Sequence, residues 1–188
     1  MYTGGPLDRA GDRRRGDAAV AELLSHPKAR VAPVWRDRNL VEPGDDKSDG
    51  GPRAGWLTGE AAVTVTMHAS VQVFLGLWED APYFAVDLSH HEEQALPDLV
   101  NGATFEDLRQ VGRLLAADEA TILAYARGMT HWHRRQKYCS DCGSPTEARD
   151  SGHVQACTNP DCGRSHFPRT DPAAQPPPGW GWAMSTLP

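Results

Sequence analysis

The chain has 188 residues and a formal net charge of −6, a length that fits one ordinary domain or two small ones. Leu, Ile, Val and Phe together supply only 32 of these residues, so we expect a modest core, long loops and stabilisation from outside the core. No apolar run approaches the ~20 residues that span a bilayer, and no apolar segment follows the basic run at residues 13–15. We therefore expect a cytoplasmic protein without a secretory signal or a membrane span.

The first part of the chain is expected to be mainly β-structure. Residues 1–16 are rich in Gly, Arg and Asp without periodicity, which predicts a disordered lead-in. The apolar side chains of residues 17–25 share one helical face, which predicts a short helix. Residues 30–41 alternate loosely between apolar and polar side chains, which predicts two strands joined around residues 37–39.

Three more strands are expected after a polar loop at residues 42–55 that is rich in Gly and Pro. Short apolar runs place them at residues 62–66, 71–78 and 83–88. The turn-forming residues 79–82 join the last two strands into a hairpin.

Helices are expected to follow these strands. Thr104 is a candidate cap for a helix whose apolar residues recur every three or four positions up to Leu115. Asp118 is a candidate cap for a second helix, which has acids in its first turn and cations near residue 135. Three apolar residues of this second helix are expected to face the β-structure: Ile122, Ala126 and Met129.

All four cysteines of the chain lie in one short window, in the patterns C-x2-C and C-x4-C with 14 residues between the pairs. Two such pairs can form a tetrahedral four-thiolate site, and soft thiolate ligands favour zinc over magnesium or calcium. A glycine follows the second cysteine of each pair and suits the left-handed turn that closes such a knuckle. The predicted zinc ligands are Cys139, Cys142, Cys157 and Cys162.

Two alternatives to this four-thiolate site remain open. The cysteines could form two disulfides, which is disfavoured in a cytosolic chain. His153 and His166 are near enough to be spare ligands, although we favour surface positions on a ribbon for both. Four protein thiolates leave no open coordination position, so we expect a structural zinc rather than a catalytic one.

The residues around the cysteines resemble the NADH pyrophosphatases, which are NAD(H) diphosphatases of the Nudix hydrolase superfamily. Residues 132–143 resemble the helix end and first knuckle of that family, and residues 162–173 resemble its passage from the zinc ribbon to the catalytic domain. Weaker similarity extends the match to about residues 18–173. The shorter matching segments are residues 74–76, 82–88 and 105–109.

The resemblance implies an α+β chain with a mainly antiparallel β domain at residues 17–135 and a zinc ribbon at residues 136–173. In the full-length family a Nudix domain follows, whose glutamates hold Mg or Mn and whose reaction splits NADH or NAD into NMN(H) and AMP. Some members also remove NAD caps from RNA. The family has an aromatic residue before Pro-Arg that lies near the substrate. Phe167 holds that position in this chain. The alternative is that Phe167 is a ribbon residue that packs against the N-terminal domain.

The chain departs from the family after Ala173. No Arg-Glu dipeptide occurs, and the only Glu pair, Glu92-Glu93, lacks the spacing of the Nudix box. Residues 174–188 contain three consecutive prolines, which cannot donate to a central strand, so we expect an irregular tail from a frameshift or a truncated gene. An evolved short regulator is the alternative. We expect no catalytic residues, no Mg or Mn binding and no hydrolysis by this chain alone.

A binding module is the second functional hypothesis. Four cations between residues 127 and 137 could contact RNA, but the end of a helix explains them equally well, and residues 1–126 carry a net charge of −8. Nucleic-acid binding is therefore disfavoured, while a protein partner or a homodimer remains open. The cations are Arg127, Arg134, Arg135 and Lys137.

Overall fold

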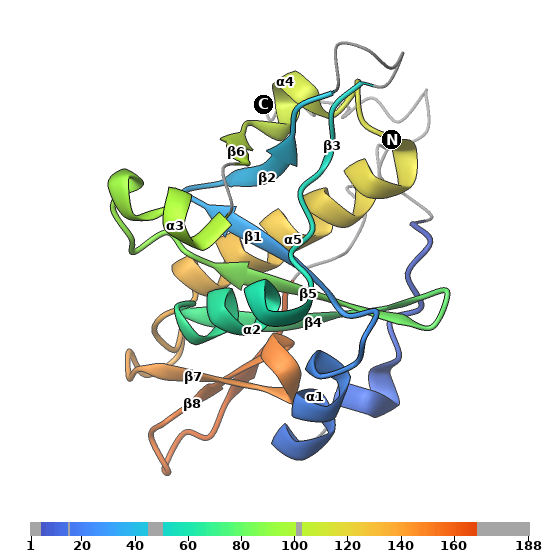
Figure 1. Ribbon diagram of the computed structural model, residues 1–188. Coiled ribbons are helices and arrows are strands. Elements are labelled where there is room, and N and C mark those ends of the chain that lie inside the picture. The colour runs from blue at the N-terminus through green and yellow to red at the C-terminus, as the bar shows by residue number, and fades with distance from the viewer. Residues whose placement is uncertain (1–4, 15, 45–50, 101–102, 169–188) are drawn as a thin grey trace, which may run out of the picture.

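A six-stranded sheet forms the centre of the protein (Figure 1). The computed structural model describes residues 5–14, 16–44, 51–100 and 103–168. The sheet order is β3-β2-β1-β5-β4, and β6 also pairs with β2. Its strands are β1 (Arg30–Trp35), β2 (Arg38–Glu42), β3 (Arg53–Ala54), β4 (Val71–Trp78), β5 (Ala81–Asp87) and β6 (Thr104–Glu106). The expected antiparallel character is confirmed, with one parallel pair between β1 and β5.

Both expected hairpins close through two-residue turns in the left-handed region. Arg36 and Asp37 have φ values of 46° and 66° in the β1–β2 turn, and Glu79 and Asp80 have 49° and 62° in the β4–β5 turn. Positive φ at both central positions matches the right-handed twist of the flanking strands. The first turn lies slightly earlier than the expected centre at residues 37–39.

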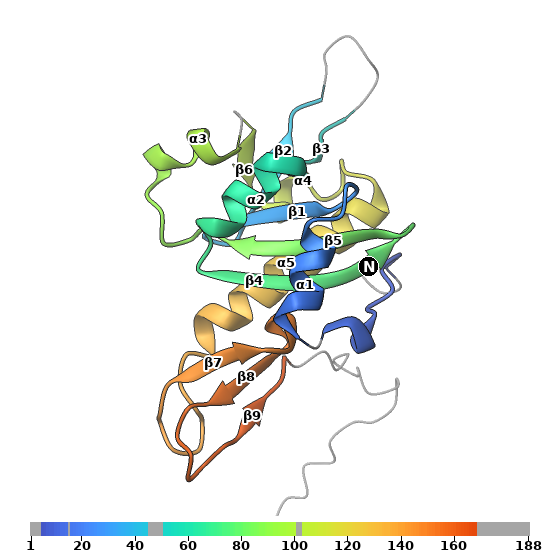
Figure 2. The same cartoon turned by 60° about the horizontal axis from the view of Figure 1, so that its bottom comes forward.

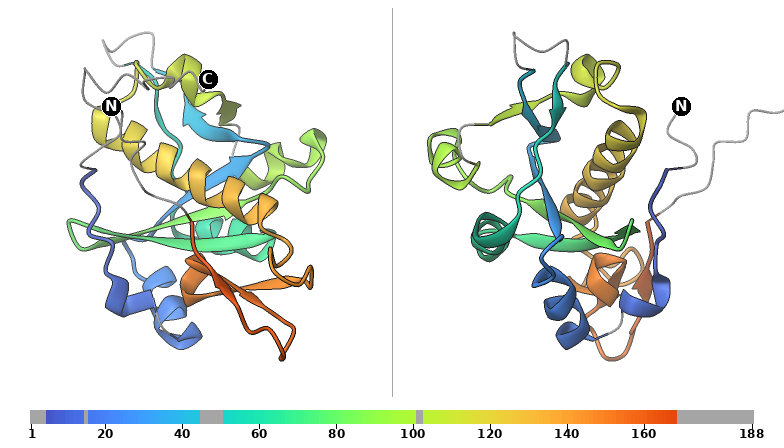
Figure 3. Two further views of the ribbon diagram at one scale, coloured as in Figure 1. Left: turned by 180° about the vertical axis from the view of Figure 1, so that it is seen from behind. Right: turned by 45° about the vertical axis from the view of Figure 1, so that its right-hand side comes forward.

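Helices cover both faces of the sheet (Figure 3, right). Helix α5 (Ala117–Arg135) packs on one face, and α2 (Gly59–Met67) and α3 (Pro97–Val100) pack on the other. Successive side chains of β4 therefore enter different cores: Val73 faces α5, whereas Phe74 lies on the α2 side. The remaining helical segments are η1 (Gly11–Arg14), α1 (Asp17–Leu24), η2 (Glu93–Ala95), α4 (Leu108–Val111) and η3 (Asp150–Gly152).

Helix α5 confirms the prediction from its periodicity. Its residues Ile122, Ala126 and Met129 are buried in the core that α5 forms with β4 and β5. The helix starts two residues earlier than the Asp118 cap implied, because Ala116 takes the N-cap position without a side-chain bond. Asp118 instead lies in the first turn, where a carboxylate favours the positive end of the helix dipole.

Two predicted elements are wrong. Residues 62–66 form helix α2 rather than a strand, because Ala62 and Val65, three positions apart, face the sheet while Val63 is 45% exposed. The helix expected from Thr104 is replaced by β6, which pairs with β2, and by the short α4. Asp107 caps α4 through its carboxylate, which accepts the backbone N–H of Arg109 at 3.0 Å.

The N-terminal segment also differs from expectation. Residues 5–14, predicted as part of a disordered lead-in, lie along the protein: Asp8 forms a β-bridge with Leu77, and Ala10 is buried. The loop after β2 likewise ends in a short strand, β3. The predicted tail at residues 174–188 lies outside the described residues, as do residues 169–173 of the predicted ribbon.

A second, three-stranded antiparallel sheet follows α5 and lies beside the β4 edge of the first (Figure 2). Its strands are β7 (Thr146–Arg149), β8 (Val154–Cys157) and β9 (Ser165–His166), in the order β7-β8-β9. Within the described residues, no helix is both long and apolar enough to cross a membrane.

Candidate metal centre and adjoining groove

The first cysteine pair sits in a tight turn between α5 and β7. The backbone N–H of Gly143 donates to the carbonyl oxygen of Cys139 at 3.0 Å, and the N–H of Cys139 donates to the Ser144 carbonyl at 2.8 Å. Gly143 has φ of 74°, the left-handed conformation that its position after the cysteine predicts. This turn brings the Cys139 and Cys142 side chains to one side.

The second pair sits in the longer turn between β8 and β9. The carbonyl oxygen of Asn159 accepts the N–H of Cys162 at 3.1 Å and that of Gly163 at 2.9 Å. The Asn159 side chain also accepts the N–H of Asp161 at 3.0 Å. Gly163 has φ of 57°, again left-handed. The two extra residues of C-x4-C are thus accommodated by a turn that Asn159 organises.

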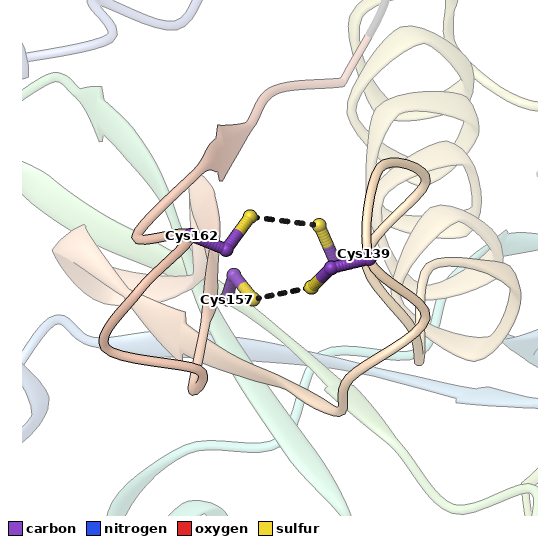
Figure 4. A group of neighbouring side chains, drawn as sticks. Cys139, Cys157 and Cys162 are labelled. Carbon is purple, nitrogen blue, oxygen red and sulfur yellow. Dashed lines mark hydrogen bonds between the residues drawn. The ribbon is translucent and has the colours of Figure 1, made fainter.

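The two turns converge, so that the four cysteine sulfurs lie within 4.8 Å of one another (Figure 4). The Sγ atoms of Cys139 and Cys162 are 3.7 Å apart, and those of Cys142 and Cys157 are 3.4 Å apart. A tetrahedral zinc with bonds of ~2.3 Å requires sulfurs about 3.8 Å apart. The donor set and its spacing therefore suit zinc, whereas a disulfide would need sulfurs ~2 Å apart.

Local groups act differently on these thiols. The Ser144 hydroxyl and backbone N–H lower the pKa of Cys142 to about 6. Burial raises the pKa of Cys157 to about 12. A divalent cation would favour the thiolate form at every position. Within the described residues, these cysteines are the only group of three or more metal-ligating side chains close enough to share an ion.

The two histidines near the ribbon have structural partners. His166 Nε2 lies 3.4 Å from the Cys139 sulfur, where its N–H can donate to a thiolate. His153 is buried rather than on the surface, and its Nε2 donates to the Phe74 carbonyl at 2.7 Å. Burial lowers the pKa of His153 to about 4, so the ring is neutral near pH 7.

A second buried imidazole attaches the ribbon to α5. His133 Nε2 donates to the Gly152 carbonyl at 2.7 Å, and the side-chain amide of Gln155 donates to His133 Nδ1 at 2.6 Å. Burial lowers the pKa of His133, which keeps Nδ1 free to accept. Neither contact could be predicted, since nothing in the local sequence distinguishes His133 from the cations beside it.

The cationic stretch at the end of α5 is partly neutralised. Arg134 donates to Asp87 at 3.0 Å and to the Ser89 hydroxyl at 2.8 Å, and it also pairs with Asp37. Asp87 is 2% exposed, so Arg134 balances a buried charge. Arg127 pairs with Asp107 at 3.4 Å. Two of the four cations proposed as an RNA patch therefore have intramolecular partners.

A groove of about 790 Å³ runs between α5 and the ribbon. Phe167 lies on its ribbon side and is 64% exposed. The aromatic rings of Tyr125 and Trp132 line the groove from α5, and the cations Arg135 and Arg164 line it from the helix end and the ribbon. The structure thus places Phe167 beside a hollow with aromatic and cationic walls.

The fold and the cysteine cluster define a class of protein: a zinc ribbon joined to a sheet domain with helices on both faces. Residues 28–132 match the model of the NADH pyrophosphatase-like rudimentary NUDIX domain, and residues 134–167 match the NADH pyrophosphatase zinc ribbon domain. The chain therefore belongs to the NADH pyrophosphatase family, as its sequence motifs indicate.

Three curated relatives illustrate the similarity. Nudix hydrolase 19, chloroplastic, of Arabidopsis thaliana is 29% identical over 78% of this chain and 37% of the plant protein. The NAD-capped RNA hydrolase NudC of Stutzerimonas stutzeri is 32% identical over 53% of this chain and 33% of that protein. NudC of Mycobacterium bovis is 30% identical over 88% of this chain and 48% of that protein. The chain thus spans a third to a half of these relatives.

Proposed function

We propose that this chain is a zinc-stabilised binding portion of an NAD(H) diphosphatase, which holds a nucleotide in the groove beside Phe167 but does not cleave it. The observation that carries the proposal is the meeting of an exposed aromatic ring, two further aromatic walls and two arginines around one hollow. The ligand of the groove would be NAD(H) or the NAD-derived end of a capped RNA, in keeping with the names of the relatives of this chain.

The zinc in this proposal is structural. Cys139, Cys142, Cys157 and Cys162 would hold one ion through four thiolates, which leaves no coordination position for a substrate or water. The ion would supply folding free energy to a ribbon that has few apolar residues of its own. Four reduced thiols also favour a reducing compartment such as the cytoplasm.

The groove offers the two interactions that a nucleotide needs. Rings such as Phe167 and Trp132 can stack on a base or on nicotinamide, and stacking contributes about 1–3 kcal/mol per base. Arg135 and Arg164 can contact the diphosphate, because a guanidinium matches two phosphate oxygens at once. These interactions bind and orient a dinucleotide, and none of them activates a water.

The proposed lack of turnover rests on the carboxylates. Diphosphate cleavage in the family needs divalent ions held beside the scissile phosphates. Asp118 and Glu119 are adjacent on α5 and point in different directions. Glu119 is also occupied, because its carboxylate accepts the Ala54 N–H at 3.2 Å and the Trp56 indole N–H at 3.3 Å. No carboxylate cluster among the described residues could take its place.

The test of binding compares two exposed aromatic residues of the ribbon. Phe167 is 64% exposed and lines the groove, whereas Tyr138 is 63% exposed and does not line it. We expect NADH titrated into the full chain to quench tryptophan fluorescence, with a Kd at least about tenfold weaker in Phe167→Ala, the loss of one stacking contact. Tyr138→Ala should bind like the native chain. Equal affinities for all three proteins would place the ligand elsewhere.

The same groove would bind an NAD-capped RNA through its capped end. A 5′-NAD-RNA oligonucleotide should bind tighter than a triphosphate RNA of the same sequence if the groove reads the dinucleotide. Equal, strongly salt-dependent retention of both RNAs would instead favour the alternative of a general RNA-binding ribbon.

A further inference from the structure

The zinc ribbon contacts the outer edge of β4 through an unusual loop. Three consecutive residues of this loop, Asp150, Ser151 and Gly152, have φ values of 48°, 54° and 85°. A Cβ on Gly152 would lie 2.9 Å from the Gln72 carbonyl oxygen, so the backbone of this loop is in direct contact with the backbone of β4. Left-handed non-glycine residues persist only where their surroundings hold them. The contacts that surround this loop must therefore hold it in its conformation.

The N-terminal strap, which we define as residues 5–14, supplies part of that support. The Ser151 hydroxyl donates to the Arg14 carbonyl at 2.7 Å, across 137 positions of the chain. The Arg14 guanidinium turns back and donates to the Arg9 carbonyl at 2.7 and 3.1 Å. The strap and the ribbon loop thus meet directly (Figure 3, right).

The strap is held on the sheet at its other end. Asp8 and Leu77 exchange both backbone hydrogen bonds, at 2.8 and 2.7 Å. Gly76 lets the strap approach, since a Cβ there would lie 2.2 Å from the Asp8 carbonyl oxygen. The edge of β4 is therefore shared, with the strap at Leu77 and the ribbon at Phe74, whose carbonyl accepts His153.

The strap also reaches the groove. The Arg9 guanidinium lies 4.2 Å from the centre of the Tyr125 ring and donates to its hydroxyl at 3.3 Å. Tyr125 is one of the aromatic walls of the groove. The strap consequently contacts the sheet edge, the ribbon loop and a groove residue of α5 within ten residues.

We propose that the N-terminal strap is a latch that holds the zinc ribbon against β4, so that release of the strap loosens the ribbon. The proposal is independent of what the groove binds. It follows because the strap contributes a hydrogen bond to a strained ribbon loop, and the Asp8–Leu77 pair holds the strap in the position where it can do so.

The test measures hydrogen exchange of the β8 amides, residues 154–157, in the full chain loaded with zinc. Ser151→Ala removes the bond to Arg14, and Asp8→Pro removes the N–H that pairs with Leu77. One hydrogen bond of about 1 kcal/mol corresponds to about a fivefold change in local opening. We expect each variant to speed β8 exchange about fivefold, and the double variant to match Asp8→Pro alone.

A control variant and a second readout separate this latch from general damage. Ser25→Ala removes an exposed hydroxyl that donates within α1, to the Ala21 carbonyl at 2.9 Å, and should leave β8 exchange unchanged. Zinc transfer to a chromophoric chelator should accelerate with the exchange rate. Faster trypsin cleavage at Arg9 would show that the strap is free in Asp8→Pro. If β8 exchange then stayed at the native rate, the proposal would be overturned. Fully additive effects in the double variant would also contradict it, because the two contacts would then be independent.

Discussion

His153 and Phe74 join the two sheets of the protein: the imidazole Nε2 donates at 2.7 Å to a backbone carbonyl of the edge strand β4. An edge carbonyl without a partner invites pairing with another chain. Here the ribbon satisfies it with a buried neutral ring. The zinc ribbon is thus part of the cover of the main sheet as well as a metal site.

This contact predicts a pH dependence of stability. Burial holds the folded pKa of His153 at about 4, below the ordinary histidine value of 6.5. Between these values the unfolded chain binds the proton and the folded chain does not, so stability falls as pH decreases through this window. The loss from pH 7 to pH 4.5 should be about 2 kcal/mol for this residue. Urea unfolding at several pH values measures it.

The zinc-binding thiolates also bind protons in acid and would lower the stability of the fold. The contribution of His153 to the pH dependence of stability is therefore isolated by comparing variants. His153→Gln keeps an N–H donor but cannot titrate, and it should have a flatter pH profile than the native chain. His90→Gln, at an exposed imidazole in the loop after β5, should leave the pH profile of urea unfolding like that of the native chain. The same slope in His153→Gln would show that His153 does not set the pH dependence.

Arg134 provides a prediction about buried charge. Arg134→Met leaves Asp87, which is 2% exposed, without its ion-pair partner. Breaking a buried pair in this way costs about 3 kcal/mol or more. The neighbouring Arg135→Met removes an equal charge from an exposed position and should change stability by less than about 0.5 kcal/mol. Equal effects in thermal unfolding would mean that the ion pair does not stabilise the fold.

The zinc assignment predicts different outcomes for the two kinds of candidate ligand. Cys157→Ser should lose stoichiometric zinc and melt the ribbon, because a hydroxyl is a poor replacement for a thiolate. His166→Gln should retain one zinc per chain, since His166 contacts the Cys139 sulfur rather than the cluster centre. Elemental analysis after gel filtration tests both. Zinc loss from His166→Gln would make the histidine a ligand.

The features that the sequence predicted correctly depend on local chemistry. The knuckles follow from cysteine spacing and from Gly143 and Gly163, whose left-handed turns involve only neighbouring residues. Helix α5 follows from its apolar periodicity. Residues 62–66 were predicted as a strand because Val and Thr, both β-branched, alternate from residue 63 to residue 66, and only packing against the sheet selects a helix.

The missed features depend on partners that are distant in the chain. Arg134 appeared to be a helix-terminal cation, yet its acidic partners Asp87 and Asp37 lie 47 and 97 positions away. His153 contacts Phe74 across 79 positions. The strap was missed because Asp8 pairs through its backbone, which leaves no trace in side-chain composition.

Release of AMP from NADH tests most directly whether the chain binds the dinucleotide without cleaving it. Purified, zinc-loaded chain is incubated with NADH and Mg or Mn, and AMP is quantified against a mock purification and an EDTA control. We expect NADH binding that depends on Phe167, together with AMP formation at the level of the mock purification. Binding without turnover would be contradicted by AMP formation at the rate of an intact family member, if that AMP formation requires the metal and is abolished by EDTA.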